Sequence, residues 1–361
     1  MTVGRVRARQ RREYLDWLRG IAVLLMIEAH LFESWTGEPD RQTDAYRNVM
    51  LVGGMGTALF LLLAGVAVGL SAGSKFRRSG DVSAAATAVA KRGLQIFALA
   101  FLFRLQAWIL GWSSNIRDLL KVDVLNVMGP SIVVAALLWR ACGSVRGRAI
   151  LFALVALAIA MVSPTVRAMS LSFLPDAIKG YVVPVAGLSN FVFFPWTALV
   201  FAGACLGVLI DSTSTPAPER RVNLWIGIGG GALAVFAFAA SFLPSPFEHS
   251  DFWTSSLSYF LIRVGVIMGL IAIAYAWTNA TMSTGRWSPM IQLGRTSFFI
   301  YWIHVEMIYG LISRPFHHAL SLRQVSVAYV LFTLFMLACS VAKERVVEWY
   351  RLGRGGLEAS V

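Results

Sequence analysis

The sequence is short of charge. Aspartate, glutamate, lysine and arginine occupy 14% of the 361 positions, while 57% are apolar, and a soluble domain carries about 25% charged residues. This shortage excludes a disordered chain, which needs low hydrophobicity and high charge. It also excludes one large water-soluble domain, because a single aqueous core does not hide so much apolar surface. The remaining solvent for that surface is lipid, so the sequence predicts a protein that crosses a membrane several times.

Cysteine is scarce as well. Cys142, Cys205 and Cys339 lie within or at the end of apolar segments, and they offer neither a disulfide framework nor metal-ligand spacing. No two histidines have a metal-binding spacing within one predicted helix. We therefore expect no metal site.

Acidic residues are fewer than basic ones, 19 against 32, so the net charge is +13. In a soluble protein this excess favours a nucleic-acid partner. In a membrane protein the same excess is expected, because lysine and arginine gather in the cytoplasmic loops. We predict a lipid bilayer and no nucleic acid among the partners.

Ten segments approach the roughly 20 apolar residues that one bilayer crossing needs. They are residues 14–34, 49–72, 94–112, 122–139, 149–165, 189–210, 223–243, 255–277, 291–312 and 325–342. No linker separates them into domains. The sequence therefore predicts an all-α, polytopic transmembrane helix bundle of about ten spans, forming a single domain over residues 1–361.

The basic residues alternate between the two sides of these spans. With the N-terminus inside, 20 lysines and arginines fall on the cytoplasmic side and 8 on the other, as the positive-inside rule requires. Residues 1–13 then form a basic cytoplasmic N-terminus ahead of a retained first helix, and residues 343–361 a cytoplasmic tail. We expect an integral, multi-pass protein of a bacterial inner or cell membrane.

Pairs of glycines four residues apart recur in the spans. They are Gly65/Gly69, Gly203/Gly207, Gly227/Gly231 and Gly265/Gly269. Small residues at this spacing let membrane helices approach closely. We interpret the pairs as helix-packing faces rather than ligand sites.

The first span holds five ionisable residues: Asp16, Arg19, Glu28, His30 and Glu33. At about 100° per residue, Arg19 and His30 fall within roughly 20° of each other, and Asp16 and Glu33 share their side. An ionisable group inside a span costs at least ~2.5 kcal/mol and marks a functional site by default. The alternative is an Asp16–Arg19 ion pair beside a buried structural histidine.

A second intramembrane histidine, His304, favours the functional interpretation. Other polar residues expected inside spans are Arg104, Gln106, Asp123, Asn126, Arg263, Arg295, Tyr301 and Glu306. Arg295 and Glu306 also share a helix face by the same eleven-residue spacing as Arg19 and His30, with His304 roughly opposite. The remaining histidines, His249, His317 and His318, fall in exterior loops and are expected to be solvated.

Four stretches carry a resemblance to integral-membrane acyltransferases. They are LDWLRGIAVLLMIEAH from Leu15, VDVLNVMGPSIVV from Val122, FPWTALVFAGACLG from Phe194 and LGRTSFFIYWIH from Leu293. The first, with an arginine ten residues before a histidine, resembles both the acyltransferase-three family and the heparan-α-glucosaminide N-acetyltransferase-like family. The other three are more similar to the second. Asn126 departs from the pattern, which leads us to expect a glutamine or similar residue there.

The resemblance implies an acyltransferase that moves an acyl group, acetyl above all, from cytoplasmic acetyl-CoA to an amine or hydroxyl of a sugar or glycan. Such a transfer needs a base or a nucleophile, and histidine serves as either. We assign that role to His30, whose pKa should be lowered by burial. Glu33, one turn away, either orients His30 or opposes that lowering of its pKa. His304 is a second catalytic candidate or a hydrogen-bonding partner of Tyr301.

Substrate contacts are expected from the remaining polar residues. Arg19, paired with Asp16, lies near the cytoplasmic mouth and suits the anionic donor. Arg77, Arg78, Lys91 and Arg92 could hold its nucleotide end, although orientation alone also demands basic inner loops. Further substrate-binding candidates are Asp123, Asn126, Arg104, Arg263, Arg295 and Tyr301. The three arginines either line the path of the substrate through the membrane or pair with Asp123 and Glu306.

A transporter is the alternative from another class. Intramembrane acidic and basic residues also build proton or substrate paths. Transporters often show internal repeats and interrupted helices, and no repeat is visible in this sequence.

Overall fold

The structure, a computed structural model, describes residues 12–111, 115–213, 215–281 and 287–358. These residues form helices joined by short loops, with no strand among them. The helices are α1 (Glu13–Trp35), α2 (Glu38–Arg41), α3 (Asp44–Ser79), α4 (Val82–Gly111), η1 (Ile116–Leu120), α5 (Val124–Ala141), α6 (Val145–Arg167), α7 (Asp176–Val182), α8 (Phe193–Asp211), α9 (Pro216–Ala240), α10 (Leu257–Thr281), α11 (Pro289–Arg295), α12 (Ser297–Tyr309), η2 (Leu311–Phe316) and α13 (Leu322–Glu358). The predicted all-α bundle is confirmed. The basic N-terminal tail up to residue 11 lies outside the described residues.

Eight of these helices are long and apolar enough to cross a membrane. They are α3, α4, α5, α6, α8, α9, α10 and α13, and each corresponds to one predicted span. The first predicted span is also one helix, α1, but its ionisable residues set it apart in composition. Polar side chains are tolerated there because neighbouring helices surround α1 and bury most of it.

The ninth predicted span, 291–312, is not one helix. It is divided at Thr296 into α11 and α12. Backbone groups freed inside a membrane need partners, and here the Gln292 carbonyl oxygen accepts from the Thr296 hydroxyl at 3.0 Å and from the Ser340 hydroxyl of α13 at 3.3 Å. Arg295 at the end of α11 and Glu306 on α12 therefore lie in two helices, rather than in the single helix that their predicted common face requires.

Two of the glycine pairs make a very close contact between α3 and α8. A methyl group at Gly65 would overlap the carbonyl oxygen of Val200, and one at Gly203 would overlap that of Leu62. Gly69 and Gly207 also face each other. At the α3–α8 interface the backbone atoms of the two helices are thus in direct contact, as the small-residue spacing predicts.

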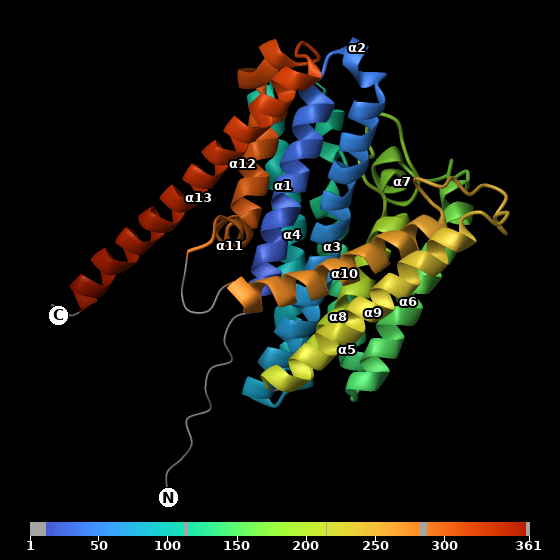
Figure 1. Cartoon of the computed structure of the whole chain (residues 1–361), viewed down its shortest axis with the longest axis vertical. Coiled ribbons are helices and arrows are strands. Elements are labelled where there is room, and N and C mark those ends of the chain that lie inside the picture. Colours follow the sequence, from blue (N-terminus) through green and yellow to red (C-terminus); the bar gives the residue numbers. More distant parts are fainter. Residues whose placement is uncertain (1–11, 112–114, 214, 282–286, 359–361) are drawn as a thin grey trace, which may run out of the picture.

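The pairing of α9 with α10 differs from the prediction by one position. A methyl group at Gly231 or Gly269 would meet nothing within 4 Å, whereas one at Gly230 would press on the Gly265 carbonyl. The contact therefore runs through Gly230 and Gly265. In Figure 1, α9 and α10 cross the lower part of the bundle obliquely as a pair.

Helix α1 begins and helix α13 ends on the same side of the bundle, the lower side in Figure 1. This arrangement agrees with an even number of membrane crossings. The side that holds both of these helix ends is the one predicted to be cytoplasmic. Apolar side chains on one outer face of α13 are more than half exposed: Val327, Val330, Leu331 and Leu334. Such an exposed apolar face suits contact with lipid.

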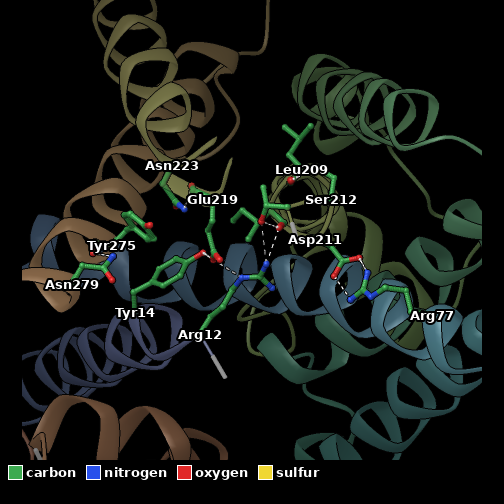
Figure 2. Close-up of polar contacts among 12 residues, drawn as sticks. Arg12, Tyr14, Arg77, Leu209, Asp211, Ser212, Glu219, Asn223, Tyr275 and Asn279 are labelled. Atoms are coloured by element: carbon green, nitrogen blue, oxygen red, sulfur yellow. Dashed lines mark hydrogen bonds and ion pairs between the residues drawn. The ribbon is translucent and has the colours of Figure 1, made fainter. Parts of the chain in front are cut away.

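Ion pairs tie the helices together at that same end (Figure 2). Arg12 donates to Glu219 of α9 at 2.6 Å and to the Ile210 carbonyl at the end of α8 at 2.8 Å. Arg77 of α3 makes two hydrogen bonds to Asp211, at 2.5 and 2.8 Å. Arg77 is thus engaged by the protein itself, which argues against its suggested part in donor binding.

Candidate active site

A cavity of about 510 Å³ lies between α1, α3, α4 and α12, toward the end of the bundle opposite the start of α1. We call it the histidine cavity. Its polar lining consists of His30, Glu33, Thr57, Arg104, Lys121, Asp123, Asn190, Tyr301, Glu306 and Tyr309. The loops at 121–124 and 190–191 close it and are joined by backbone hydrogen bonds from Val122 to Leu188 and from Asn190 to Val122.

His30 of α1 and His304 of α12 are in direct contact. Their Nδ1 and Nε2 atoms lie 3.0 Å apart, and the rings stack with centroids 5.1 Å apart at 19°. His304 is fully buried behind the cavity wall, whereas His30 lines the cavity. The two histidines selected from sequence therefore form one pair, in which His30 is the member that a substrate reaches.

The hydrogen bonds assign the proton positions of the neutral pair. Nδ1 of His304 lies 2.7 Å from the Ile300 carbonyl oxygen, which only accepts, so this nitrogen carries the proton. Nε2 of His304 is then an acceptor, and Nδ1 of His30 must donate to it. Nε2 of His30 is left with a free lone pair, which is the form that a base or nucleophile requires.

Tyr301 and Asp123 form the opposite part of the lining. Both line the cavity, and the Asp123 carboxylate accepts from Arg104 at 2.5 Å and from the Val124 amide at 2.8 Å. The expected pairing of Arg104 with Asp123 is present. A carboxylate held by these two donors has a fixed position, and Tyr301 lies about one turn before His304 on α12.

Asn126 does not line the cavity. Its side-chain oxygen accepts from the Asp123 amide at 3.0 Å in the capping box of α5, and its amide donates to the Tyr181 hydroxyl at 3.1 Å. Burial raises the pKa of this tyrosine in the short helix α7. Asn126 therefore holds the Asp123 backbone and α7 in place, and its polar atoms are occupied by the protein.

Glu33 lies at the rim of the histidine cavity. Its carboxylate accepts from the Tyr309 hydroxyl at 2.8 Å, and its backbone carbonyl accepts from Arg41 at 2.6 Å. Arg41 also donates to His318, which is an exposed loop histidine as expected. The partner of His30 is His304, so the expected orienting role passes from Glu33 to the second histidine.

Arg19, Asp16 and Arg295 lie at the other end of α1. Arg19 donates to the buried Asp16 at 3.1 Å and lines a second cavity of about 420 Å³ with Arg295 and Lys343. We call it the basic cavity. Arg295 pairs with Glu13 at 3.3 Å, not with Asp123 or Glu306 as expected. Gly20 and Gly294 allow α1 and α11 to touch there, since a methyl group on either would overlap the other helix.

Arg263 is placed apart from all of these residues. Its guanidinium lies 3.9 Å from the Tyr259 ring centroid and 5.3 Å from that of Trp196. Such cation–π contacts stabilise a buried cation without a carboxylate. Arg263 is not among the residues that line the histidine cavity, so the structure does not bring it together with the other candidate site residues.

Sequence reasoning missed some of the lining. Glu306 was considered only as an arginine partner, and Tyr309 and Lys121 were not selected. A signal for Tyr309 exists, because Tyr301, Val305 and Tyr309 recur four residues apart on one face of α12. Lys121 comes from a loop, where no periodicity points to it.

A comparison with known protein families gives a match over part of the chain. The family model for the catalytic domain of heparan-alpha-glucosaminide N-acetyltransferase matches residues 11–238, which include His30, Arg104 and Asp123. No curated protein matches the chain. Because the family match covers well over half of the sequence, this integral, multi-pass membrane protein belongs to the heparan-alpha-glucosaminide N-acetyltransferase catalytic-domain family.

Proposed function

We propose that this protein transfers an acetyl group from acetyl-CoA, bound from the predicted cytoplasmic end, to an amine or hydroxyl of a sugar in the histidine cavity. The observation that carries the proposal is the His30–His304 pair, which leaves a lone pair on the cavity-lining ring. Family membership supports the acetyl group and the transferase class.

In the direct route, Nε2 of His30 takes the proton of the acceptor amine or hydroxyl as that atom bonds to the acetyl carbon. The carbon–sulfur bond of the thioester breaks, and the proton returns from His30 to the leaving thiolate, which gives free CoA. General-base catalysis of this kind contributes about 100-fold or more. In the relay route, the same nitrogen bonds the acetyl carbon as the carbon–sulfur bond breaks and CoA leaves as the thiolate. The acceptor then bonds that carbon, the nitrogen–carbon bond breaks, and the acceptor proton neutralises the thiolate.

His304 supports either route without touching the substrate. Its Nε2 accepts the Nδ1 proton of His30 and so holds the ring in one tautomer and one orientation. When His30 gains a positive charge, this hydrogen bond becomes charge-assisted and stronger. His304 is thus proposed as a positioning residue rather than a second catalytic base.

The donor is proposed to enter at the basic cavity. CoA carries several phosphate charges, and Arg19, Arg295 and Lys343 line this cavity together. Arg19 also lines a third, largely apolar cavity of about 260 Å³, whose other basic residue is Arg92. From Arg19 to His30 the helix advances about 16 Å, a length that an extended pantetheine arm spans.

The acceptor is proposed to bind among the carboxylates and hydroxyls of the histidine cavity. Sugars present many hydrogen-bond donors, and Glu33, Asp123 and Glu306 supply acceptors in this lining. One oxygen of Glu306 has no hydrogen-bond partner in the described part of the chain. A buried acceptor of this kind costs free energy until a donor reaches it, and a sugar hydroxyl or amine would provide one.

The test uses the purified full chain in lipid nanodiscs with acetyl-labelled acetyl-CoA and an amino sugar such as glucosamine. We expect labelled N-acetyl product with the natural protein and at least a 100-fold lower rate with His30→Ala. Omitting the acceptor separates the routes, because only the relay leaves label on the protein. Uptake of the sugar into vesicles without any transfer would instead support a transporter and contradict the proposal.

A further inference from the structure

The third cavity, of about 260 Å³ and lined by Arg19 and Arg92 among mostly apolar residues, is called the apolar cavity here. It meets the histidine cavity at two aromatic rings. Phe60 of α3 lines the apolar cavity, and Tyr301 of α12 lines the histidine cavity. The two rings stack with centroids 6.3 Å apart and planes at 12°. Phe103 of α4 adds a third ring, 5.9 Å from that of Tyr301. These three rings form a layer, which we call the aromatic partition.

Two of the three rings are held in place by polar groups. Tyr301 packs edge-on against the buried His304, with ring centroids 5.8 Å apart. Phe103 packs edge-on against Trp302 at 5.1 Å, and the Trp302 indole donates to Gln106 at 2.8 Å. For Phe60, the stack on Tyr301 is the one ring contact found in the described part of the chain, and no polar group holds its ring. Its ring is also the most exposed of the three, at 8% against 2% for Tyr301 and 1% for Phe103.

The partition stands where the proposed reaction requires a passage. The basic and apolar cavities share Arg19 and Ser297, so a donor reaching past Arg19 enters the apolar cavity with its thioester end. His30 lies on the far side of the partition. The thioester therefore reaches the His30 nitrogen only if one of the rings moves, and Phe60 is the untethered one.

We propose that Phe60 is the gate of the aromatic partition and sets the size of the acyl group that passes from the apolar cavity to His30. The inference rests on the proposed function for the identity of the passing group, but the gate itself is a property of the fold. A ring turned partly aside admits a two-carbon acetyl group, whereas a longer chain needs the ring to leave its place against Tyr301. The closed ring also keeps water in the histidine cavity away from the waiting thioester.

The first experiment detects the gate without any acyl transfer. Thr57 and Ser71 are small polar residues of the same helix, α3, in the histidine cavity and the apolar cavity respectively. Each is replaced by cysteine in a chain whose natural cysteines are changed to alanine. A membrane-impermeant thiol reagent is then added to one face of membrane vesicles at a time.

We expect Ser71→Cys to react from one face only and Thr57→Cys to be protected from that face. In the Phe60→Ala background, Thr57→Cys should become reactive from the Ser71 face by tenfold or more. Phe152→Ala is the matched control, because Phe152 is a buried ring stacked on Phe201 at 6.5 Å and is not among the lining of either cavity. The proposal is overturned if Thr57→Cys already reacts from the Ser71 face, or if Phe60→Ala leaves it protected.

The second experiment measures the acyl selectivity. In Phe60→Ala we expect acceptor-independent hydrolysis of acetyl-CoA to rise severalfold, and the rate with butyryl-CoA to rise relative to acetyl-CoA. Phe60→Trp, which keeps an aromatic ring and adds bulk, should lower acetyl transfer and leave the protection of Thr57→Cys intact. An unchanged butyryl-to-acetyl ratio in both variants would overturn the selectivity role. If no variant transfers acetyl but the labelling changes as expected, the proposed function fails while the gate stands.

Discussion

Nδ1 of His30 and Nε2 of His304 lie 3.0 Å apart although 274 residues separate them in sequence. The carbonyl of Ile300 fixes the direction of this hydrogen bond, because it takes the other ring proton of His304. The pair therefore behaves as one unit. Removing either member should affect the same step, which leads to the first prediction.

His30→Ala should lower the transfer rate by about 100-fold or more, because the base is lost. His304→Ala should cost less, since Nε2 of His30 remains while its tautomer is no longer fixed. The double variant should be little worse than His30→Ala alone, because residues that act as a unit are not additive. Steady-state kcat and KM for all three variants decide this. Fully multiplicative losses would show that the two histidines act independently.

Arg19→Ala should weaken acetyl-CoA binding, and Arg19→Lys should restore part of it, because lysine keeps the charge but not the planar fork of donors. Arg19 also pairs with Asp16, which is only 1% exposed, and removing one member of such a pair is itself destabilising. Donor affinity is therefore measured in Arg19→Ala and in Asp16→Ala with Arg19→Ala. Full recovery of affinity in the double variant would show that Arg19 serves only the ion pair.

Glu306→Gln should raise the KM for the acceptor several-fold and leave the KM for acetyl-CoA unchanged. The reason is that Glu306 lines the histidine cavity with a free acceptor oxygen and is not among the residues that line the basic cavity. Glu28→Gln is the matched control, since Glu28 is half-buried on α1 and is not among the lining residues. Equal changes in both KM values would contradict an acceptor-specific role.

Gly65→Ala should destabilise the protein by several kcal/mol, in the range of severe core substitutions, because its methyl group would overlap the Val200 carbonyl. Gly231→Ala is the control, since a methyl group there meets nothing within 4 Å and alanine favours helix by about 0.5–1 kcal/mol. Thermal unfolding in detergent compares the two. Similar melting temperatures would refute the close α3–α8 packing.

The orientation of the bundle is tested with reporters. A cytoplasmic reporter fused after Val361 should be active, and one inserted after Ser245, in the loop between α9 and α10, should not, because the positive-inside rule places them on opposite sides. Both reporters active on the same side of the membrane would show that one predicted crossing is absent.

Most of the fold could be predicted from the sequence, because the bilayer thickness sets a length for which apolar runs can be searched. The break at Thr296 could not, since residues 291–312 contain no proline to interrupt a helix and the partner that permits the break, Ser340, comes from α13. The shift from Gly231 to Gly230 likewise depends on how α9 rotates against α10. A periodic pattern predicts a face, not the register of its partner.

For the site, sequence patterning identified His30, Glu33, Arg104, Asp123 and Tyr301, which all line one cavity. Intramembrane ionisable residues are costly, so their presence is a signal that composition alone carries. Asn126 was selected on the same ground, but its place three residues after Asp123 is also the spacing of a capping box, and the structure uses it so. Polarity in a span reveals that a partner exists without saying which one.

The sequence by itself determined that this chain crosses the membrane and which side chains are too polar for lipid, because both depend on the local cost of transferring residues out of water. The tertiary structure alone decided that His304 stands behind His30, that Arg263 rests on Tyr259 and Trp196, and that Phe60 meets Tyr301 between two cavities. Those relationships join helices far apart in the chain. They depend on the packing of whole helices against one another, which no local stretch of residues encodes.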